Sequence, residues 1–150
     1  QLGGYLNYSF IDAGFKAFNE DGTYQQLAGN RFRMTPENSV AVGLDWTLPL
    51  AAGRSVFIRP SYNWRSQMFF EDSNDPDPLT GLALEEGAYG LFNLRAGLRF
   101  NPRWDVTALG NSLNDRKYIV DAGNTGLIFG IPTLIPGASR MYGVTLTGKF

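Results

Sequence analysis

Apolar and polar residues alternate strictly along several stretches of this chain. In Val40–Leu50 every even-numbered residue is a large apolar one, and the residues between are small, polar or proline. A period of two residues places successive side chains on opposite faces of a β-strand, so this stretch is predicted as a strand with one apolar face. The stretch Val56–Phe70 repeats the pattern. Because only a short connection containing Gly53 separates the two stretches, they are predicted to form a hairpin.

The same alternation predicts further strands elsewhere in the chain, and no segment has a convincing helical period. These strands are Gly3–Phe18, Leu91–Phe100, Trp104 to about Val120, and about Arg140–Phe150. The fold class expected is therefore all-β, with about six antiparallel strands in up-and-down order.

The connections between the predicted strands alternate in length. Residues 19–38, 71–90 and 121–139 form long connections, whereas residues 51–55 and 101–103 form short ones. Long loops on one side and short turns on the other are typical of outer-membrane barrels, in which the short turns are periplasmic. This arrangement places the end of the chain at the periplasmic rim.

Strand length and aromatic placement bear on the choice between a membrane barrel and a soluble sandwich. The predicted strands are longer than the roughly 5–6 residues of soluble strands, and long enough for the about 9–11 residues of spanning strands. Aromatic side chains lie towards the strand ends, as in barrel girdles. They are Trp46, Phe70, Phe92, Phe100, Trp104, Tyr142 and Phe150. A membrane barrel is favoured, and a sandwich stays the alternative because its strands alternate too.

Composition narrows the chemistry that this chain can perform. The sequence has no Cys and no His, which excludes a disulfide framework, a thiolate metal site and a Ser-His-Asp site within the chain. The formal net charge of −1 gives no indication of nucleic-acid binding. No stretch approaches the roughly 18–20 apolar residues of a membrane helix. The chain is expected to be no enzyme and to need no cofactor.

One acidic connection is a candidate for calcium binding. Asp72, Asp75 and Asp77 have near-alternate spacing, but Pro76 interrupts them, and the Gly and distal Glu of an EF-hand register are missing. A solvated surface loop is the favoured interpretation of this segment, because loops are generally polar surface.

Three motifs occur in an order that resembles one known family. Leu27–Pro36 contains a Gly-Asn-Arg…Pro pattern, Asn111–Tyr118 reads Asn-Ser-Leu-Asn-Asp-Arg-Lys-Tyr, and Pro136–Val144 contains an Arg-Met-Tyr-Gly run. Together they resemble the late barrel strands of TonB-dependent outer-membrane receptors. One departure is Gly148, which stands where the family's terminal signature has a bulky apolar residue.

The resemblance implies a bacterial outer-membrane barrel of about 22 strands with an amino-terminal plug. Residues 1–150 then correspond to the carboxyl-terminal portion of the barrel, and the plug and remaining strands are not part of this chain. The partners implied are those missing parts, the barrel-assembly machinery, TonB through the plug region, and outer-membrane lipid. The activity implied is import of a scarce nutrient, most often an iron–siderophore chelate. The alternatives are a porin-like diffusion barrel and a soluble sandwich that binds carbohydrate.

Three groups of residues are candidates for function. The first is an assembly signal on the last strand, the second a set of arginines on polar strand faces, and the third a pair of aromatic residues in long loops. The arginines either contact the plug or an anionic substrate, or line the lumen in pairs with carboxylates. The loop residues either contact ligand or pack against neighbouring loops. In order, the groups are Tyr142, Val144, Leu146 and Phe150; Arg59, Arg65, Arg95 and Arg99; and Tyr24 and Phe129.

Overall fold

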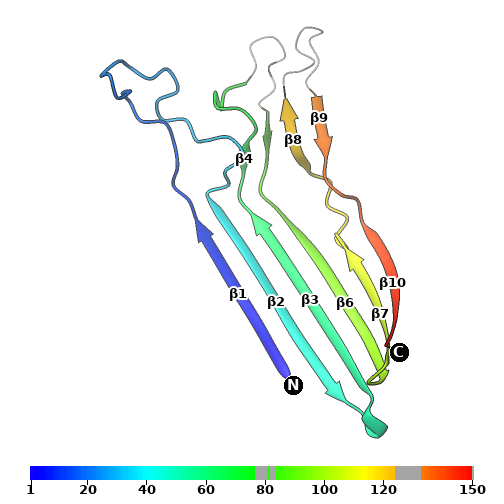
Figure 1. Cartoon of the computed structure of the whole chain (residues 1–150). Coiled ribbons are helices and arrows are strands. Elements are labelled where there is room, and N and C mark those ends of the chain that lie inside the picture. The colour runs from blue at the N-terminus through cyan, green and yellow to red at the C-terminus, as the bar shows by residue number, and fades with distance from the viewer. Residues whose placement is uncertain (77–80, 82–83, 124–132, 150) are drawn as a thin grey trace.

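Six antiparallel strands form one sheet in the order β1-β2-β3-β6-β7-β10 (Figure 1). The computed structural model describes residues 1–76, 81, 84–123 and 133–149. The sheet strands are β1 (Leu2–Phe10), β2 (Asn38–Pro49), β3 (Ser55–Arg65), β6 (Tyr89–Asn101), β7 (Trp104–Asn111) and β10 (Met141–Gly148). The other described residues form two short two-stranded sheets, a 3₁₀ turn and irregular segments. They are β4 (Met68–Phe69) with β5 (Glu85–Glu86), β8 (Ile119–Gly123) with β9 (Thr133–Pro136), and η1 (Ala51–Gly53).

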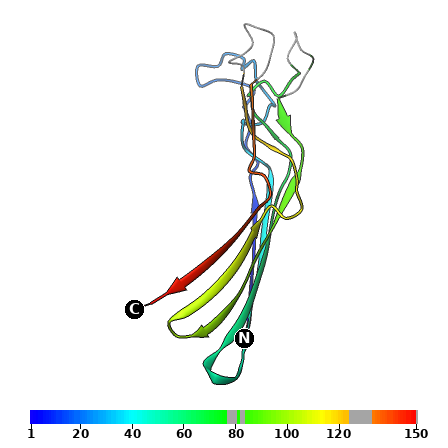
Figure 2. The ribbon, with the colours of Figure 1, turned by 90° about the vertical axis from the view of Figure 1, so that its right-hand side faces the viewer.

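The sheet is a curved band with different structures at its two ends. The three long connections lie together at one end, and the two short turns and both termini lie at the other (Figures 1 and 2). Strands β1 and β10 are the two edges and do not pair with each other, so the six strands form an open sheet. The predicted all-β fold with six antiparallel strands is confirmed. No helix in the described ranges is long and apolar enough to cross a membrane.

The register of the sheet separates apolar from polar side chains. Val42 pairs with Tyr62, and Tyr62 pairs with Phe92, so even-numbered residues share one face across the strands. The exception is the pair Asn101–Trp104 at a bulge beside the turn. We call the even-numbered side the apolar face; it carries no charged residue in any of the six strands. The odd-numbered side is the polar face.

The apolar face is open to its surroundings. Leu6 on β1 is 70% exposed and Val144 on β10 is 75% exposed. Among the described residues, no second sheet packs across this face, which argues against the sandwich alternative. Exposed apolar surface of this extent, arranged as a continuous face, marks a site that contacts a protein, a membrane or a ligand.

Close packing within the sheet depends on glycines placed opposite aromatic rings. Tyr5 pairs with Gly43, Phe57 with Gly97 and Trp104 with Gly148. A Cβ atom at Gly43 would lie 2.5 Å from Tyr5 Cε1, and one at Gly148 would lie 2.7 Å from Trp104 Cη2. The aromatic rings therefore lie directly on the glycine backbone of the next strand. This contact explains the departure at Gly148, since the indole of Trp104 occupies the space that a bulky residue would fill.

Two predicted strands are shorter in the structure than the alternation indicated. The first ends at Phe10 instead of Phe18, and β3 ends at Arg65 instead of Phe70. Ser66 turns the chain away: its backbone N–H donates to the carbonyl of Asn38 (2.9 Å), and its hydroxyl accepts from the Asn38 N–H (3.0 Å). The prediction that Phe70 belongs to an aromatic girdle was wrong, because this ring is 4% exposed within the connections.

The fifth predicted strand is also shorter. It was expected to run from Trp104 to about Val120, but β7 ends at Asn111. Ser112 and Asp115 then adopt positive φ angles of 52° each, which bends the backbone. The chain resumes as β8, which pairs with β9 inside the region expected to be a loop at residues 121–139.

The hydrophobic core of the described residues lies outside the sheet. Met68, Phe70, Leu84 and Ala122 are each at most 8% exposed, and Ile119 packs against them. We call the described residues of 11–37, 66–88 and 112–140, which connect the strands at this end, the loop layer. The loop layer buries apolar side chains among its own segments, whereas the sheet leaves its apolar face open.

Candidate functional site

The charged residues of the six strands all lie on the polar face. Strands β3 and β6 each contribute two arginines, and strands β2 and β7 each contribute one aspartate. They are Arg59, Arg65, Arg95, Arg99, Asp45 and Asp105. The chain as a whole has a net charge of −1, so positive charge is concentrated on this face. The predicted placement of the four arginines on polar strand faces agrees with the register.

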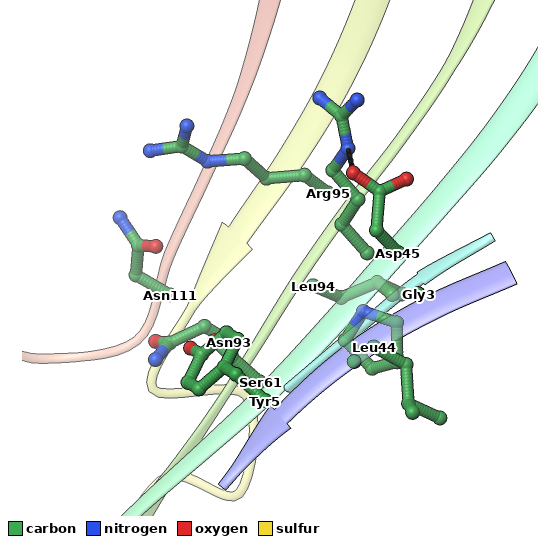
Figure 3. Close-up of a pocket in the computed structure, with 12 residues that line it drawn as sticks. Gly3, Tyr5, Leu44, Asp45, Ser61, Asn93, Leu94, Arg95 and Asn111 are labelled. Carbon is green, nitrogen blue, oxygen red and sulfur yellow. Dashed lines mark hydrogen bonds and ion pairs between the residues drawn. The ribbon is translucent and has the colours of Figure 1, made fainter. Parts of the chain in front are cut away.

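A depression of about 480 Å³ on the polar face brings several of these groups together (Figure 3). It is lined by residues of five neighbouring strands, and Asp45, Asn93, Arg95 and Asn111 lie around it. Amides and guanidinium groups supply hydrogen-bond donors at this site.

Arg59 is held in place by two contacts. Its Nε donates to Asp45 Oδ2 at 2.8 Å, across the pair of strands β2 and β3. Its guanidinium carbon lies 4.6 Å from the centroid of the Phe57 ring on the same face. Phe57 is 7% exposed, because its ring lies between this guanidinium and the backbone of Gly97. Asp45 therefore neutralises Arg59 and Phe57 orients it.

The other three arginines have different surroundings. Arg65 lies with its guanidinium carbon 5.3 Å from the centroid of the Tyr89 ring. Within the described part of the chain, no carboxylate lies within ion-pair distance of Arg95 or Arg99. Among the described residues, an ion pair with a carboxylate therefore forms at Arg59 and at none of the other three arginines.

The Gly-Asn-Arg motif joins the first long connection to the second. The Asn30 side-chain amide donates to the carbonyl of Asp72 (3.0 Å), and Asn74 Oδ1 accepts from the Arg31 N–H (2.6 Å). Asn74 in turn donates to the Arg31 carbonyl (3.0 Å), and the Arg33 N–H donates to the Asp72 carboxylate (3.2 Å). Asn74 has a φ of 53°, a conformation that Asn tolerates better than most residues. The motif therefore connects two segments of the loop layer.

Beyond the end of β7, the Asn111–Tyr118 motif continues the hydrogen bonding with β6. The Asn114 side chain accepts from the Phe92 N–H (3.1 Å) and donates to the Gly90 carbonyl (2.7 Å). One side-chain amide thus replaces the two hydrogen bonds that a paired residue of β7 would make. The motif ends at Tyr118, whose ring stacks on the ring of Tyr89 with centroids 4.6 Å apart.

A buried carboxylate joins the second long connection to the third. Glu86 is 7% exposed, and its Oε1 lies 3.1 Å from Arg116 Nη2. Its Oε2 accepts from the Ile119 N–H at 2.7 Å. A buried carboxylate needs such partners to offset the loss of water. Together with the contacts of Asn30 and Asn74, this site links all three segments of the loop layer.

The tip of the first long connection carries an exposed aromatic pair. Tyr24 is 66% exposed, and its ring centroid lies 6.2 Å from that of Phe18 in an edge-to-face arrangement. The Thr23 hydroxyl and backbone N–H donate to the Asp21 carboxylate at 2.6 and 2.9 Å, which lowers the pKa of Asp21. The second predicted loop residue, Phe129, lies outside the described residues.

The last strand presents its predicted residues on the apolar face. Tyr142, Val144 and Leu146 are 72%, 75% and 64% exposed, respectively. They lie on the side of β10 that faces away from the polar depression, along the sheet edge. Phe150, the fourth predicted member of this group, lies outside the described residues.

The family profile that matches this chain is described as TonB dependent receptor-like, beta-barrel, and it covers residues 1–111. The chain belongs to this family. The family resemblance is thereby confirmed, and the motif Leu27–Pro36 lies within the matched residues. Members of the family are outer-membrane β-barrels that act as transport receptors. No curated protein matches the chain with significant sequence similarity.

Two solved structures share the fold of this TonB-dependent receptor segment. The ferric yersiniabactin uptake receptor FyuA from Yersinia pestis has a TM-score of 0.82 at 17% identity, over 99% of this chain and 21% of that one. The ferric-catecholate import receptor Fiu from E. coli K12 has a TM-score of 0.67 at 17% identity, over 99% of this chain and 19% of that one. The chain thus spans about a fifth of the length of each receptor.

Several residues that organise this receptor segment were missed by sequence reasoning. Asn74 and Glu86 lie in a stretch interpreted as a solvated acidic loop, yet they hold the loop layer together. Phe57 is the only apolar residue at an odd position of β3, and this break in the alternation was the signal that could have found it.

Proposed function

We propose that this chain is part of the wall of a bacterial outer-membrane receptor that imports a scarce nutrient, with an iron chelate the favoured cargo. Membership of the TonB-dependent receptor family supports the transport role. The titles of the two similar structures name ferric yersiniabactin uptake and ferric-catecholate import for those proteins. Because both of these receptors share the fold of this chain, they support an iron chelate as the class of cargo proposed here.

The observation that carries this proposal is the open, two-faced sheet. Its apolar face has no charge in six strands, and its edges β1 and β10 have no partner strand among the described residues. Unpaired backbone groups are costly in lipid, so the remaining barrel strands of the receptor pair with these edges. The apolar face contacts outer-membrane lipid, and the polar face lines the lumen that holds the plug.

The loop layer provides the external surface on which cargo is captured. Tyr24, beside Phe18, offers an exposed aromatic surface for an apolar or aromatic part of the ligand. Phe129 belongs to the same proposed set. After capture, energy delivered through TonB displaces the plug, and the loops and wall of this chain undergo no covalent chemistry.

The terminal strand supplies the signal for barrel assembly. Tyr142, Val144, Leu146 and Phe150 form this proposed signal, which the barrel-assembly machinery binds. Exposure of the first three along an unpaired edge supports this role. Deleting Phe150 in the full receptor should lower its level in the outer membrane more than it weakens ligand binding by the receptor that is assembled.

The test of the proposed function uses the full-length receptor in a bacterial host that lacks its own iron-chelate receptors. Membranes are fractionated, and uptake of a panel of radioactive ferric siderophores is measured with and without TonB. Outer-membrane recovery and TonB-dependent uptake of at least one chelate are expected. TonB-independent entry of small solutes would favour a diffusion barrel instead, and recovery without detergent in the soluble fraction would exclude both.

A further inference from the structure

The two ends of the sheet carry opposite charge. The long connections at one end (residues 11–37, 66–88 and 112–140) contain twelve acidic and six basic residues. At the end with the short turns, the described residues beyond the strands are 1, 50–54, 102–103 and 149, and they contain three basic residues and no acidic one. The three are Arg54, Arg103 and Lys149, which we call the basic rim.

The basic rim brings together residues that are far apart in sequence. The backbone N–H of Lys149 donates to the carbonyl of Arg103 (2.9 Å). Ser55, which follows Arg54, pairs with Arg99 of β6, and β6 joins β7 through the turn that contains Arg103. The rim therefore extends over the ends of the four adjacent strands β3, β6, β7 and β10 (Figure 1).

Hydrogen bonds within the two turns hold the basic residues at the strand ends. The Leu50 N–H donates to the Arg54 carbonyl (2.8 Å) and closes the first turn. Asn101 Oδ1 accepts from the Arg103 N–H (2.8 Å) in the second turn. Short turns closed in this way keep Arg54 and Arg103 next to the sheet.

The charges of the basic rim are not neutralised by this chain. All three residues are exposed, and among the described residues no carboxylate lies within ion-pair distance of their side chains. Asp105, two positions after Arg103, lies on the polar face. Arginine and lysine stay protonated at neutral pH, so the rim offers positive charge to a partner.

The apolar face ends next to the basic rim. Leu48 and Phe100 occupy even positions near these strand ends, and each is 43% exposed. Trp104, which is 38% exposed, begins β7 directly after the second turn. Aromatic side chains at the ends of membrane-spanning strands lie at the level of the lipid headgroups. Long basic side chains beside them can reach that level too.

We propose that the basic rim binds the phosphate headgroups of anionic phospholipids in the membrane leaflet at the short-turn end. The inference rests on one part of the proposed function, namely that the sheet is part of a membrane-spanning wall. Charge complementarity selects a phosphate, and continuity with the apolar face selects a lipid over a soluble anion. The guanidinium groups donate paired N–H bonds to phosphate oxygens, and lysine adds a point charge.

The test measures which lipid gathers beside the second turn. The full-length receptor, freed of other cysteines, carries a fluorescent donor at Pro102→Cys in phosphatidylcholine vesicles. A trace of acyl-labelled acceptor lipid is either phosphatidylglycerol or phosphatidylcholine. Energy transfer should show about a fivefold local preference for phosphatidylglycerol, the strength expected of one basic residue at an anionic surface. The preference should vanish at about 1 M salt, where the Debye length is only about 3 Å.

Two matched variants separate the basic rim from the overall charge of the receptor. The first replaces the three rim residues by glutamine and should abolish the preference. The second removes three exposed basic residues from the long connections and should leave the preference unchanged. Its substitutions are Lys16→Gln, Arg33→Gln and Lys117→Gln.

Three results would overturn the headgroup site. They are equal transfer to both lipids in the unaltered receptor, a preference that survives loss of the rim, and binding of soluble polyglutamate without any lipid preference, which would indicate an acidic protein as the partner. If the triple variant does not assemble, Arg103→Glu alone should lower the preference and Arg103→Lys should keep it. An unchanged preference in Arg103→Glu would also refute the site.

The lipid measurement is independent of the cargo. Uptake of a ferric chelate without a lipid preference would leave the proposed function standing and remove the headgroup site. A lipid preference in a receptor that imports no ferric chelate would keep the headgroup site and remove the proposed cargo.

Discussion

The sheet exposes apolar side chains, whereas the loop layer buries them. On the sheet, Leu6 and Val144 are 70% and 75% exposed, while in the loop layer Met68 and Phe70 are 3% and 4% exposed. Both regions have polar partners for the backbone, through ladder bonds in the sheet and through side chains such as Asn74 in the loop layer. The proposed function accounts for this difference, because it places hydrocarbon around the sheet and water around the loops.

The largest effect is expected from placing the same charge on the apolar or on the polar face of β10. Val144→Arg puts a charge on the apolar face, and Thr145→Arg puts the same charge on the polar face of the same strand. Arginine at the middle of a lipid-facing barrel surface costs about 2–4 kcal/mol. Denaturant unfolding of the full receptor in lipid vesicles should show this loss for Val144→Arg and little loss for Thr145→Arg. Equal losses would mean that the two faces do not meet different solvents.

A second effect concerns packing within the sheet. Gly97→Ala would bring its Cβ to 2.6 Å from Phe57 Cε1 and from the Val106 carbonyl oxygen, whereas a Cβ at Gly3 has only a contact at 4.0 Å. Overpacking of this kind costs about 1–3 kcal/mol. Thermal unfolding should therefore be lowered by Gly97→Ala and nearly unchanged by Gly3→Ala. A neutral Gly97→Ala variant would show that the contact of the Phe57 ring with Gly97 is not required.

A third effect concerns Asn114, which lies at the boundary between the sheet and the loop layer. Asn114→Ala removes the acceptor of the Phe92 N–H and the donor to the Gly90 carbonyl. Two ordinary hydrogen bonds contribute about 0.5–1.5 kcal/mol each. Hydrogen exchange should speed up at Phe92, while Lys117→Ala, on the same exposed bend, should leave that rate unchanged. Unaltered exchange at Phe92 in Asn114→Ala would contradict the role of this amide.

The strand centres and their two faces could be predicted from sequence because both depend on a local period of two. The observed β2 overlaps the predicted stretch Val40–Leu50, and the even-numbered residues of neighbouring strands share one face, as that prediction requires. The loop layer could not be predicted in the same way. Met68 and Phe70 continue the alternation of β3, but alternation cannot tell a lipid-facing ring from one buried in a loop core. The bonds of Asn30 span 42 and 43 residues of sequence, and no local pattern encodes a contact of that range.

The same distinction between local and long-range information applies to the candidate sites. The odd-numbered positions of the arginines were enough to predict that they lie on the polar face, and the register agrees with that placement. Their pairing did not follow, because Asp45 and Asp105 occupy equivalent odd positions and only the side-chain geometry shows which of them binds an arginine.

The smallest expected effect is confined to the loop layer. Asn74→Gly removes the amide that joins Arg31 to the second connection, and glycine keeps the positive φ of 53° at that position without strain. Limited proteolysis should cut residues 11–37 faster in this variant, because loop segments open locally when their tertiary hydrogen bonds are lost. The unfolding transition of the sheet should stay in place. A parallel loss of sheet stability would show that the two regions are not independent.

The most direct test of the two-faced sheet is a nitroxide scan of β6. The chain has no Cys, so single cysteines at positions 92 to 98 can carry the label in a full receptor freed of other cysteines. In lipid vesicles, the even positions should be accessible to oxygen, which concentrates in lipid, and the odd positions should not, with a period of two residues. Accessibility without that period, or even positions that meet a water-soluble relaxation reagent, would contradict the assignment of the apolar face to lipid.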